Sequence, residues 1–293
     1  MEQTLALNGR FIVIAAQAAR QKSGANLTGS IETGPIFPDL WQSKRRMDGH
    51  RISINGQHII YDPVRLGAPG ADLFDPAALA ASGRLEGRPE GGRGSALFVS
   101  LEGVQAVLRP YRRGGLLGDL LGDRYVRAPL AFTRPWREFR LLARLHREGL
   151  PVPAPLAARV VPDGLIYRGD ILVERLTDTE TLAEALSRRA LDEAQWRRVG
   201  EAVGALHRRG MDHADLNAHN VLLAGDGTVH IIDLDRARLR RPGRGWQHRN
   251  LQRLERSLRK LASERACFHP LDTAGVEALL EEWDRRVRSE ATC

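Results

Sequence analysis

The chain has 293 residues, of which 42% are hydrophobic, so it is long enough to bury a core of its own. Its formal net charge of +8 and its sequence pI of about 10.2 favour an anionic partner, such as a nucleotide, a phosphorylated lipid, a membrane surface or a nucleic acid. The two cysteines exclude a disulfide scaffold, and the longest apolar run, residues 11–19, is too short to cross a bilayer.

Residues 1–46 differ in composition from the rest of the chain. Residues 21–34 are rich in Gly, Ser, Thr and Asn and offer little to bury, and three basic residues precede Met47. We expect a disordered extension here, or a natural start of the protein at Met47. Glu2 stands where a signal peptide would be basic, so we expect the protein to stay in the cytosol.

The next segment predicts a hairpin and a short helix. Apolar residues on both sides of Asn55-Gly56 predict two short strands within residues 52–61. Residues 66–90 are loop-like, apart from a short helix expected over residues 74–81.

A glycine-rich segment, Gly91-Gly92-Arg93-Gly94, precedes strands expected at residues 96–100 and 105–109. Such a turn lets backbone amides approach phosphates closely, although glycine-rich turns also occur in ordinary hairpins. Its place upstream of the motif described below favours a nucleotide-binding role for Gly91, Gly92 and Gly94.

The middle and end of the chain predict mainly helices. Apolar residues at helical spacing predict a helix over residues 135–147, with Glu138 beside its apolar stripe. Residues 169–173 predict a buried strand, and Glu174 begins the connection that follows it. Further helices are expected between Asp192 and Gly210, over about 246–262, and over 274–287.

One motif carries most of the functional information. The segment His213-Ala-Asp-Leu-Asn-Ala-His-Asn220 has the form H-x-D-x-x-x-x-N, and Ile231-Ile-Asp-Leu-Asp235 is a hydrophobic strand that ends in carboxylates. This order of groups is typical of kinase-type phosphotransferases. It predicts that Asp215 orients or deprotonates the attacking hydroxyl, and that Asn220 and Asp233 hold the magnesium that bridges ATP phosphates.

Two strands, residues 221–223 and 229–232, are expected to pair around a turn at Gly225-Asp226-Gly227. That hairpin would bring Asn220 and Asp233 together. The alternative is that Asp215 and Asn220 only cap a turn, which explains neither the hairpin nor the terminal aspartate.

The lysine that kinases use to hold nucleotide phosphates is missing. The chain's lysines are Lys22, Lys44 and Lys260, and none follows the glycine-rich turn at the expected distance. Arg109 ends the appropriate strand, and a guanidinium can bind two phosphate oxygens at once. We therefore expect Arg109 to replace the lysine, paired with Glu138.

The segment after Asp233 departs from that of protein kinases. Asp235 stands where a glycine would follow the metal-binding aspartate, no Ala-Pro-Glu sequence follows, and little room remains for a peptide substrate. Arginines crowd this segment instead and could form a floor for an anionic acceptor or only a solvated loop. They are Arg236, Arg238, Arg240, Arg241, Arg244 and Arg249. Arg112 and Arg113 are further candidates for contacts with phosphates or an anionic acceptor.

The catalytic motif, the segment Ile232–Arg236, Tyr111-Arg-Arg-Gly-Gly115, Trp136-Arg-Glu-Phe139 and residues 250–258 together resemble bacterial 3-deoxy-D-manno-octulosonic acid (Kdo) kinases of the lipopolysaccharide core kinase family. The resemblance runs from about Arg51 to the C-terminus. It implies an α+β, protein-kinase-like fold of two lobes, with a β-rich N-lobe at residues 47–174 and a mainly helical C-lobe at residues 175–293.

The resemblance also implies ATP-dependent phosphorylation of the 4-hydroxyl of Kdo on Kdo-lipid IVA, in lipopolysaccharide core synthesis. It places such an enzyme peripherally on the cytoplasmic face of the bacterial inner membrane, with Asp215 as its catalytic residue. ATP would lie between the lobes, with its adenine on backbone groups near Glu174. We expect His213 to order the loop and His219 to be a loop residue, while Asp235 is open to a metal-binding or an acceptor-binding role.

Several alternatives remain at this point. A heptose kinase of the same pathway and an aminoglycoside-type small-molecule kinase have similar catalytic segments. A pseudokinase that binds lipid or protein would agree with the missing lysine but not with the retained Asp215, Asn220 and Asp233. A nucleic-acid binder would agree with the pI, but the low aromatic content of 5% and the absence of a recognition motif oppose it.

Overall fold

The computed structural model describes residues 49–89, 96–101, 103–111, 125–126, 128–264, 269 and 272–289. The extension expected at residues 1–46 and the glycine-rich turn at Gly91–Gly94 lie outside these ranges, so both remain predictions.

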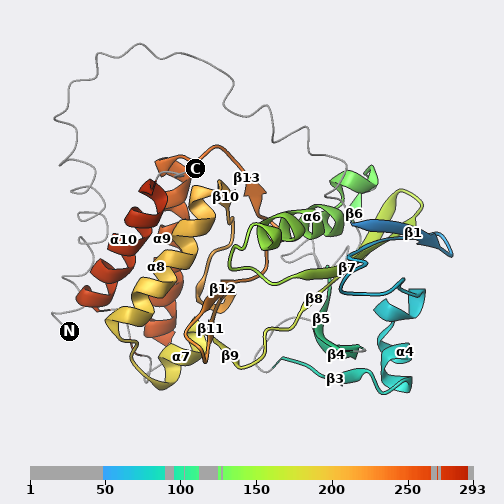
Figure 1. Cartoon of the computed structure of the whole chain (residues 1–293), viewed down its shortest axis with the longest axis horizontal. Helices are drawn as coiled ribbons and strands as arrows, with labels where there is room; N and C mark the ends of the chain where they lie inside the picture. Colours follow the sequence, from blue (N-terminus) through green and yellow to red (C-terminus); the bar gives the residue numbers. More distant parts are fainter. Residues whose placement is uncertain are drawn as a thin grey trace, which may run out of the picture.

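The described chain forms a mixed α/β fold, with a large antiparallel sheet and a group of helices (Figure 1). Its strands are β1 (His50–Ile54), β2 (Gln57–Tyr61), β3 (Leu85–Gly87), β4 (Leu97–Leu101), β5 (Val104–Pro110), β6 (Tyr125–Val126), β7 (Pro155–Asp163), β8 (Ile166–Glu174), β9 (Thr179–Thr181), β10 (Met211–Asp212), β11 (Val221–Ala224), β12 (Val229–Ile231) and β13 (Arg238–Leu239). Its helices are η1 (Ala71–Phe74), α4 (Pro76–Ala81), η2 (Leu130–Phe132), α6 (Arg134–Arg147), α7 (Leu182–Arg188), α8 (Glu193–Arg208), η3 (Ala218–Asn220), α9 (Arg244–Glu264) and α10 (Thr273–Arg288).

The large sheet has the order β1-β2-β7-β8-β5-β4-β3, and the short β6 pairs with β8. The predicted hairpin of β1 and β2 is confirmed, and positive φ angles at Asn55 and Gly56 (50° and 75°) give the tight turn that joins them. β5 lies beside β8 with Arg109 opposite Ile171, so β8 connects the β4–β5 hairpin to the middle of the sheet.

Helix α6 packs closely on the sheet and carries two residues of the site. A Cβ atom at Gly169 of β8 would lie 2.4 Å from Cγ of Pro135 and 3.1 Å from the carbonyl oxygen of Arg159. Only glycine therefore allows the first turn of α6 to approach this strand. The close approach places Glu138 within reach of Arg109 on β5, and Figure 1 shows α6 between the sheet and helices α8–α10.

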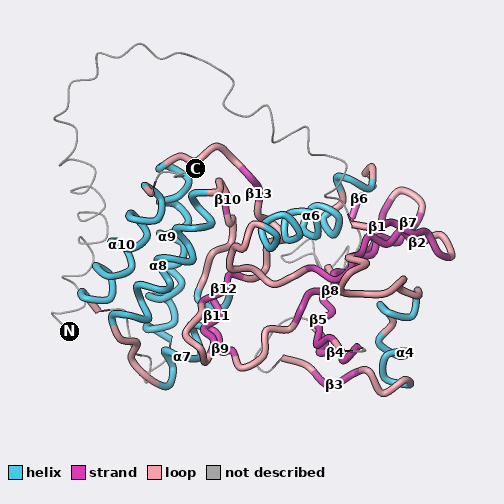
Figure 2. The backbone as a smooth tube through the Cα atoms, viewed as in Figure 1, coloured by secondary structure: helices cyan, strands magenta, loops and turns pink. Residues whose placement is uncertain are grey.

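Two hydrophobic cores cover the two faces of the sheet. The larger one runs from the face under α6, through Trp136 and Phe139, into the packing of α7–α10. The smaller one lies under α4, around Phe74 and Leu79. The larger core is therefore continuous from the sheet to the helices, and Figure 2 shows strands of the large sheet on one side of α6 and helices α8–α10 on the other.

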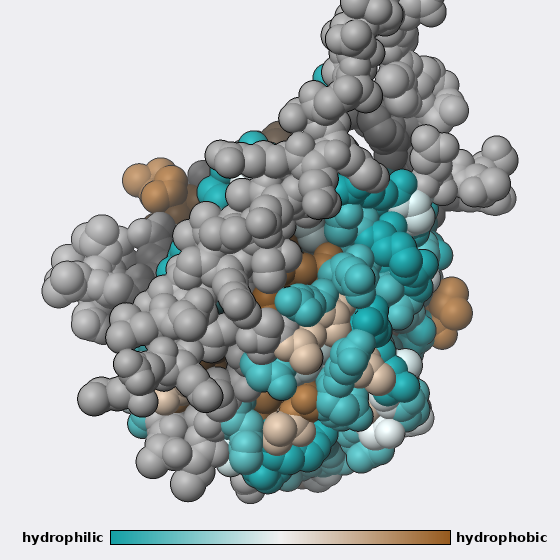
Figure 3. All heavy atoms as spheres, turned by 90° about the vertical axis from the view of Figure 1, so that its left-hand side faces the viewer, coloured by the Kyte–Doolittle hydropathy of each residue, from teal (hydrophilic) through white to brown (hydrophobic). Residues whose placement is uncertain are grey.

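The C-terminal helices follow the local signals in the sequence. A capping box between Asp192 and Gln195 begins α8, and Gly210, with a φ of 78°, follows its end. The predicted helices at 246–262 and 274–287 are confirmed as α9 and α10, each slightly longer. The described face on the α10 side is mostly hydrophilic (Figure 3).

No helix within the described ranges has both the length and the apolar character needed to cross a bilayer.

Candidate active site

A β-hairpin brings the two ends of the catalytic motif together. β11 and β12 pair with Val221 opposite Ile231, as the sequence predicts, and the carboxylate of Asp226 fixes their turn by accepting from the N–H of Thr228 at 2.8 Å. Beyond the hairpin, the N–H of Ile232 donates to the carbonyl of Asn220 at 3.0 Å. A backbone hydrogen bond therefore joins Asn220 directly to Ile232, the residue before Asp233.

The loop around Asp215 is held by its backbone. The carbonyl of Asp215 accepts from the side-chain amides of Asn220 and Asn217, at 2.9 and 3.0 Å, and its N–H donates to Nδ1 of His213 at 3.2 Å. The residue itself is exposed. The loop is thus fixed by bonds that leave the carboxylate out of the backbone network, as a group that receives a proton from a substrate requires.

His213 points inward, as the sequence predicts. Its Nε2 lies 3.0 Å from the carbonyl oxygen of Ile232, and the ring is buried. Since Nδ1 accepts from the N–H of Asp215, Nε2 is the atom that donates to Ile232. Burial lowers the pKa of His213, so the ring is neutral at pH 7. It joins the Asp215 loop to the strand before Asp233.

Asn250 of α9 anchors the same loop from below and was not predicted from the sequence. Its Oδ1 accepts from the N–H of His213 at 2.8 Å, and its Nδ2 donates to Oδ1 of Asp212 and to the carbonyl of Trp246, both at 2.8 Å. The residue is completely buried. Burial raises the pKa of Asp212, but bonds from Asn250 and Arg240 outweigh it, so that pKa is lowered overall.

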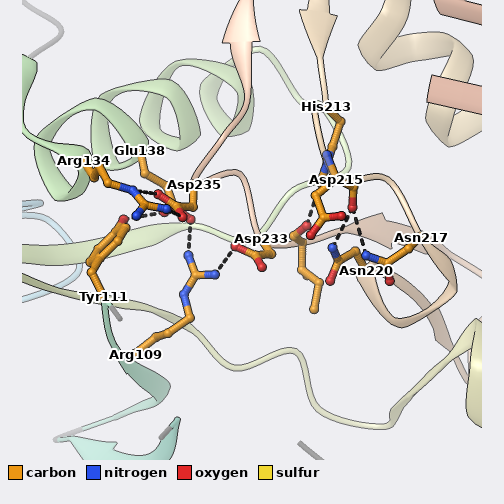
Figure 4. Close-up of polar contacts among 11 residues, drawn as sticks. Arg109, Tyr111, Arg134, Glu138, His213, Asp215, Asn217, Asn220, Asp233 and Asp235 are labelled. Atoms are coloured by element: carbon orange, nitrogen blue, oxygen red, sulfur yellow. Dashed lines mark hydrogen bonds and ion pairs between the residues drawn. The ribbon is translucent and has the colours of Figure 1, made fainter. Parts of the chain in front are cut away.

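Arg109, at the end of β5, bridges two carboxylates. One Nη atom donates to Glu138 of α6, and the other donates to Asp233 (Figure 4). Glu138 is the expected partner, whereas the contact with Asp233 was not foreseen. Burial would lower the pKa of Arg109, but the two carboxylates reverse this and raise it, so the guanidinium is permanently charged.

Glu138 lies in an enclosed position, with its side chain only 1% exposed. Its second oxygen accepts a hydrogen bond from the hydroxyl of Tyr111, and burial raises the pKa of Tyr111 well above its ordinary value. Burial also raises the pKa of Glu138, because the Arg109 guanidinium compensates only part of the lost hydration.

Asp233 and Asn220 supply oxygen atoms suited to a divalent cation. Nδ2 of Asn220 is engaged with Asp215, so Oδ1 is the atom that can bind a metal, and Figure 4 shows Asn220 in the same region as Asp233. Carboxylate and amide oxygens are what magnesium takes, and it usually keeps only one or two protein ligands besides phosphates and water. The residues therefore fit the ion. Within the described part of the chain, no group of three or more His, Cys, Asp or Glu side chains is placed to hold a metal.

A second arginine–aspartate pair lies beside the first and was also missed. Nε of Arg134, the first residue of α6, donates to Oδ1 of Asp235 at 2.6 Å, and an Nη atom contacts Oδ2. Figure 4 shows both pairs next to Tyr111. A carboxylate two residues after Asp233 was a visible signal, but its partner lies 101 positions away, among 44 basic residues.

The other predicted residues lie as follows. Glu174 ends β8, its N–H donates to the carbonyl of Ala154 at 2.8 Å, and its carboxylate lies 3.4 Å from Arg65. His219 is exposed. Gly91, Gly92 and Gly94 lie outside the described residues, as do Arg112 and Arg113.

Part of the basic segment after Asp235 is paired within the protein. Arg240 contacts Asp212 at 3.0 Å, Arg238 approaches the same carboxylate at 3.9 Å, and Arg244 contacts Asp284 at 2.8 Å. A cavity of about 720 Å³ lies elsewhere, between β9, α7 and the β11–β12 turn, and none of the site residues lines it.

The order and geometry of these groups, together with the comparisons that follow, define a phosphotransferase with an alcohol group as acceptor. The model of the lipopolysaccharide kinase (Kdo/WaaP) family matches residues 79–278. The chain belongs to the lipopolysaccharide kinase (Kdo/WaaP) family.

Several relatives are similar over most of their length. A 3-deoxy-D-manno-octulosonic acid kinase of Xylella fastidiosa (strain 9a5c) is 43% identical over 83% of this chain and 91% of that protein. Proteins of the same name from Stenotrophomonas maltophilia (strain R551-3) and Xanthomonas axonopodis pv. citri are 44% and 43% identical, each over 71% of this chain and 82% of its own length.

Proposed function

We propose that this protein transfers the γ-phosphoryl group of ATP to the 4-hydroxyl of the Kdo sugar on Kdo-lipid IVA, in lipopolysaccharide core synthesis. The observation that carries the chemistry is the joining of Asp215, Asn220 and Asp233 by the bonds around Ile232 and His213. The choice of Kdo over heptose or an antibiotic follows the relatives, which are 3-deoxy-D-manno-octulosonic acid kinases about 43% identical to this chain over the aligned residues.

We infer that residues 47–174 and 175–293 correspond to the two lobes of a protein-kinase-like fold. The separation in Figure 1 between the large sheet and helices α7–α10 supports this division, and Glu174 stands at its border. ATP would bind between the two parts. Because the N–H of Glu174 already donates to Ala154, the adenine contact proposed here uses the Glu174 carbonyl.

In the proposed reaction, Asp215 orients the sugar hydroxyl and receives its proton, because its carboxylate is exposed on a loop that the backbone holds in place. Arg109 steadies the phosphates from the end of β5, and Glu138 holds the guanidinium from behind. Gly91, Gly92 and Gly94 would contribute backbone amides over the same phosphates.

Asn220 and Asp233 would hold magnesium, which when bound neutralises the charge on the phosphates during transfer. Asp233 makes a contact with Arg109 that a metal would compete for. A guanidinium released in this way could turn to the phosphates.

We further propose that the protein binds peripherally to the cytoplasmic face of the inner membrane, where an anionic glycolipid is presented. Its net charge of +8 supports contact with an anionic surface. Arg236, Arg241 and Arg249 are exposed and supply part of this charge. Sedimentation with vesicles that contain anionic lipids, compared with neutral vesicles, tests the proposal, and salt should weaken the binding.

The decisive experiment is transfer of radiolabelled phosphate from ATP to purified Kdo-lipid IVA, with the phosphorylated position determined by NMR. The proposal expects Mg²⁺-dependent labelling at the 4-hydroxyl of Kdo and none with Asp215→Ala. Labelling of a heptose-containing acceptor or of an aminoglycoside, but not of Kdo-lipid IVA, would overturn the substrate assignment. Absence of any phosphoryl transfer by the wild type would identify a pseudokinase.

A further inference from the structure

The turn at residues 233–235 carries two carboxylates, those of Asp233 and Asp235, and each is bound by an arginine from another element. Arg109 of β5 binds Asp233, and Arg134 of α6 binds Asp235. The second pair uses both oxygens of Asp235, one through Nε at 2.6 Å and the other through an Nη atom. A pair with this fork geometry fixes orientation as well as distance.

Arg134 is itself fixed on several sides. Another of its Nη atoms donates to the hydroxyl of Tyr125 at 2.6 Å, and its backbone N–H donates to the hydroxyl of Tyr167 at 3.1 Å. Its guanidinium lies over the rings of Tyr125 and Tyr111, with its central carbon 4.9 and 5.6 Å from their centroids. The pair is also shielded from water, with side-chain exposures of 23% for Arg134 and 18% for Asp235. Such a pair is stronger than one on an open surface.

The turn needs support because its backbone is strained. Asp233 has a φ of 61°, in the left-handed region that residues other than glycine rarely adopt. Strain of this kind persists only where the surroundings enforce it. On the N-terminal side, Ile232 is held by Asn220 and His213. On the C-terminal side, Asp235 is held by Arg134.

A metal ion at Asp233 would compete with Arg109 but not with Arg134. A cation bound by Asp233 would compete with Arg109 for this carboxylate, so the Arg109–Asp233 contact would weaken. The Arg134–Asp235 pair is outside this competition and can support the turn in both states. Both oxygens of Asp235 are engaged by Arg134.

We propose that Arg134 and Asp235 are positioning residues, whose ion pair keeps the strained turn at Asp233 in the conformation that binds the metal. This inference rests on the proposed function, because it assumes that Asp233 is a metal ligand. The sequence left Asp235 open to metal binding or acceptor binding, and this inference gives it a positioning role instead.

A double-mutant cycle on kcat tests the coupling. Asp235→Asn and Arg134→Gln should each lower kcat about tenfold, with little change in the KM for the Kdo acceptor, and the double variant should be no slower than the worse single one. Arg134→Lys should recover part of the loss, because it keeps the charge. Arg137→Gln, an exposed position on the same helix, is the control and should stay within about twofold of the wild type. Multiplicative losses in the double variant would show that the two residues act independently and would overturn the proposal.

A second readout does not depend on the substrate. Hydrogen–deuterium exchange of peptides covering residues 230–240, in the unliganded full-length protein, should be faster in Asp235→Asn and in Arg134→Gln, to a similar extent. Unchanged exchange in either variant would overturn the positioning role even if activity falls. If the wild type proved inactive toward Kdo-lipid IVA, the proposed function would fail, while the exchange result would still decide whether the pair orders the turn.

Discussion

Asn250 of α9 accepts a hydrogen bond at 2.8 Å from the backbone N–H of His213, across 37 positions of sequence. The bond ties the segment before the catalytic loop to a helix of the large hydrophobic core. Because the same side chain also donates to Asp212 and Trp246, one buried amide satisfies three separate polar groups.

Replacing Asn250 should therefore affect both stability and activity. Asn250→Ala leaves the N–H of His213 and an oxygen of Asp212 buried without this partner, which should lower the free energy of unfolding by about 2–4 kcal/mol. We expect kcat to fall more than the KM for ATP rises, because the loop that carries Asp215 loses its anchor. Urea denaturation and steady-state kinetics measure the two effects. Gln252→Ala, exposed on the same helix, should change neither, and equal losses in both variants would contradict the anchoring role.

Arg109→Ala should chiefly impair the use of ATP. The change removes the cation that links β5 to Glu138 and Asp233 and leaves the carboxylate of Glu138 buried without it. We expect kcat/KM for ATP to fall about 100-fold or more. Arg109→Lys should be intermediate, since an ammonium keeps the charge but lacks the planar fork that reaches two carboxylates. Unchanged ATP affinity and rate in Arg109→Ala would mean that another arginine holds the phosphates.

Asp233→Asn should abolish turnover while preserving the fold. The amide keeps the size of the side chain but removes the negative charge that a hard cation requires. We expect kcat to fall at least about 100-fold, with the circular dichroism spectrum unchanged. A titration of Mg²⁺ against bound fluorescent ATP analogue measures the loss of metal binding directly. Normal turnover with an unaltered Mg²⁺ requirement would refute the metal assignment.

The pH dependence of ATP use should report Glu138. Burial raises the pKa of this carboxyl above 4.5, so its charged form, which pairs with Arg109, is lost at a higher pH than for an ordinary glutamate. The wild-type kcat/KM for ATP should fall on the acid side with an apparent pKa above 4.5. Glu138→Gln should be less active and lack this limb. An identical acid limb in both proteins would assign it to another group.

The raised pKa of Glu138 lowers ATP use at acid pH but favours folding there. A carboxyl with a raised pKa binds its proton more tightly in the folded state, so Glu138 favours folding at low pH and this contribution is lost as the pH rises through the folded-state pKa. The ionised form of Glu138 therefore adds no stability through this shift.

His207 should make stability depend on pH in mildly acidic solution. The ring is buried and its Nδ1 accepts from Nε1 of Trp283 at 2.8 Å, and burial lowers the pKa of His207 to about 3. Between the unfolded value of 6.5 and that value, the unfolded chain binds the extra proton, so stability falls as the pH falls. The slope from one proton is at most about 1.4 kcal/mol per pH unit.

Denaturant unfolding at pH 7.5, 6 and 5 checks this expectation, with His207→Gln as the variant that cannot titrate. The variant should show a smaller loss of stability between pH 7.5 and pH 5 than the wild type. Because burial also lowers the pKa of His213, part of the dependence should persist in the variant. If the free energy of unfolding depended on pH in the same way in both proteins, His207 would not be the group responsible.

Elements with strong local signals could be predicted from the sequence. The Asn55-Gly56 turn, the cap at Asp192 and the β11–β12 hairpin each depend on neighbours a few positions away, and each is confirmed. The strand β7 was not predicted, because its place depends on pairing with β2 and β8. Helix α7 was missed although Thr181 and Glu184 form a capping box that the sequence displays.

The site residues likewise divide into those that the sequence predicts and those that depend on long-range packing. Asp215, Asn220 and Asp233 follow from fixed spacing, and the Arg109–Glu138 pair follows from the expected order of elements. The contacts of Asp233 with Arg109 and of Asp235 with Arg134 join residues 124 and 101 positions apart. No local pattern distinguishes these arginines from the many others in the chain. Tertiary packing, such as that of α6 against β8 at Gly169, brings them to the site.

The arginine at the end of β5 also changes how the enzyme can be labelled. A guanidinium stays protonated at neutral pH and does not attack activated acyl groups as a lysine amine does. Lys260, the lysine within the described part of the chain, is on α9 with its side chain 70% exposed. Acyl-phosphate nucleotide probes, which mark ATP-binding proteins by acylating a nearby amine, would therefore meet no such nucleophile at Arg109.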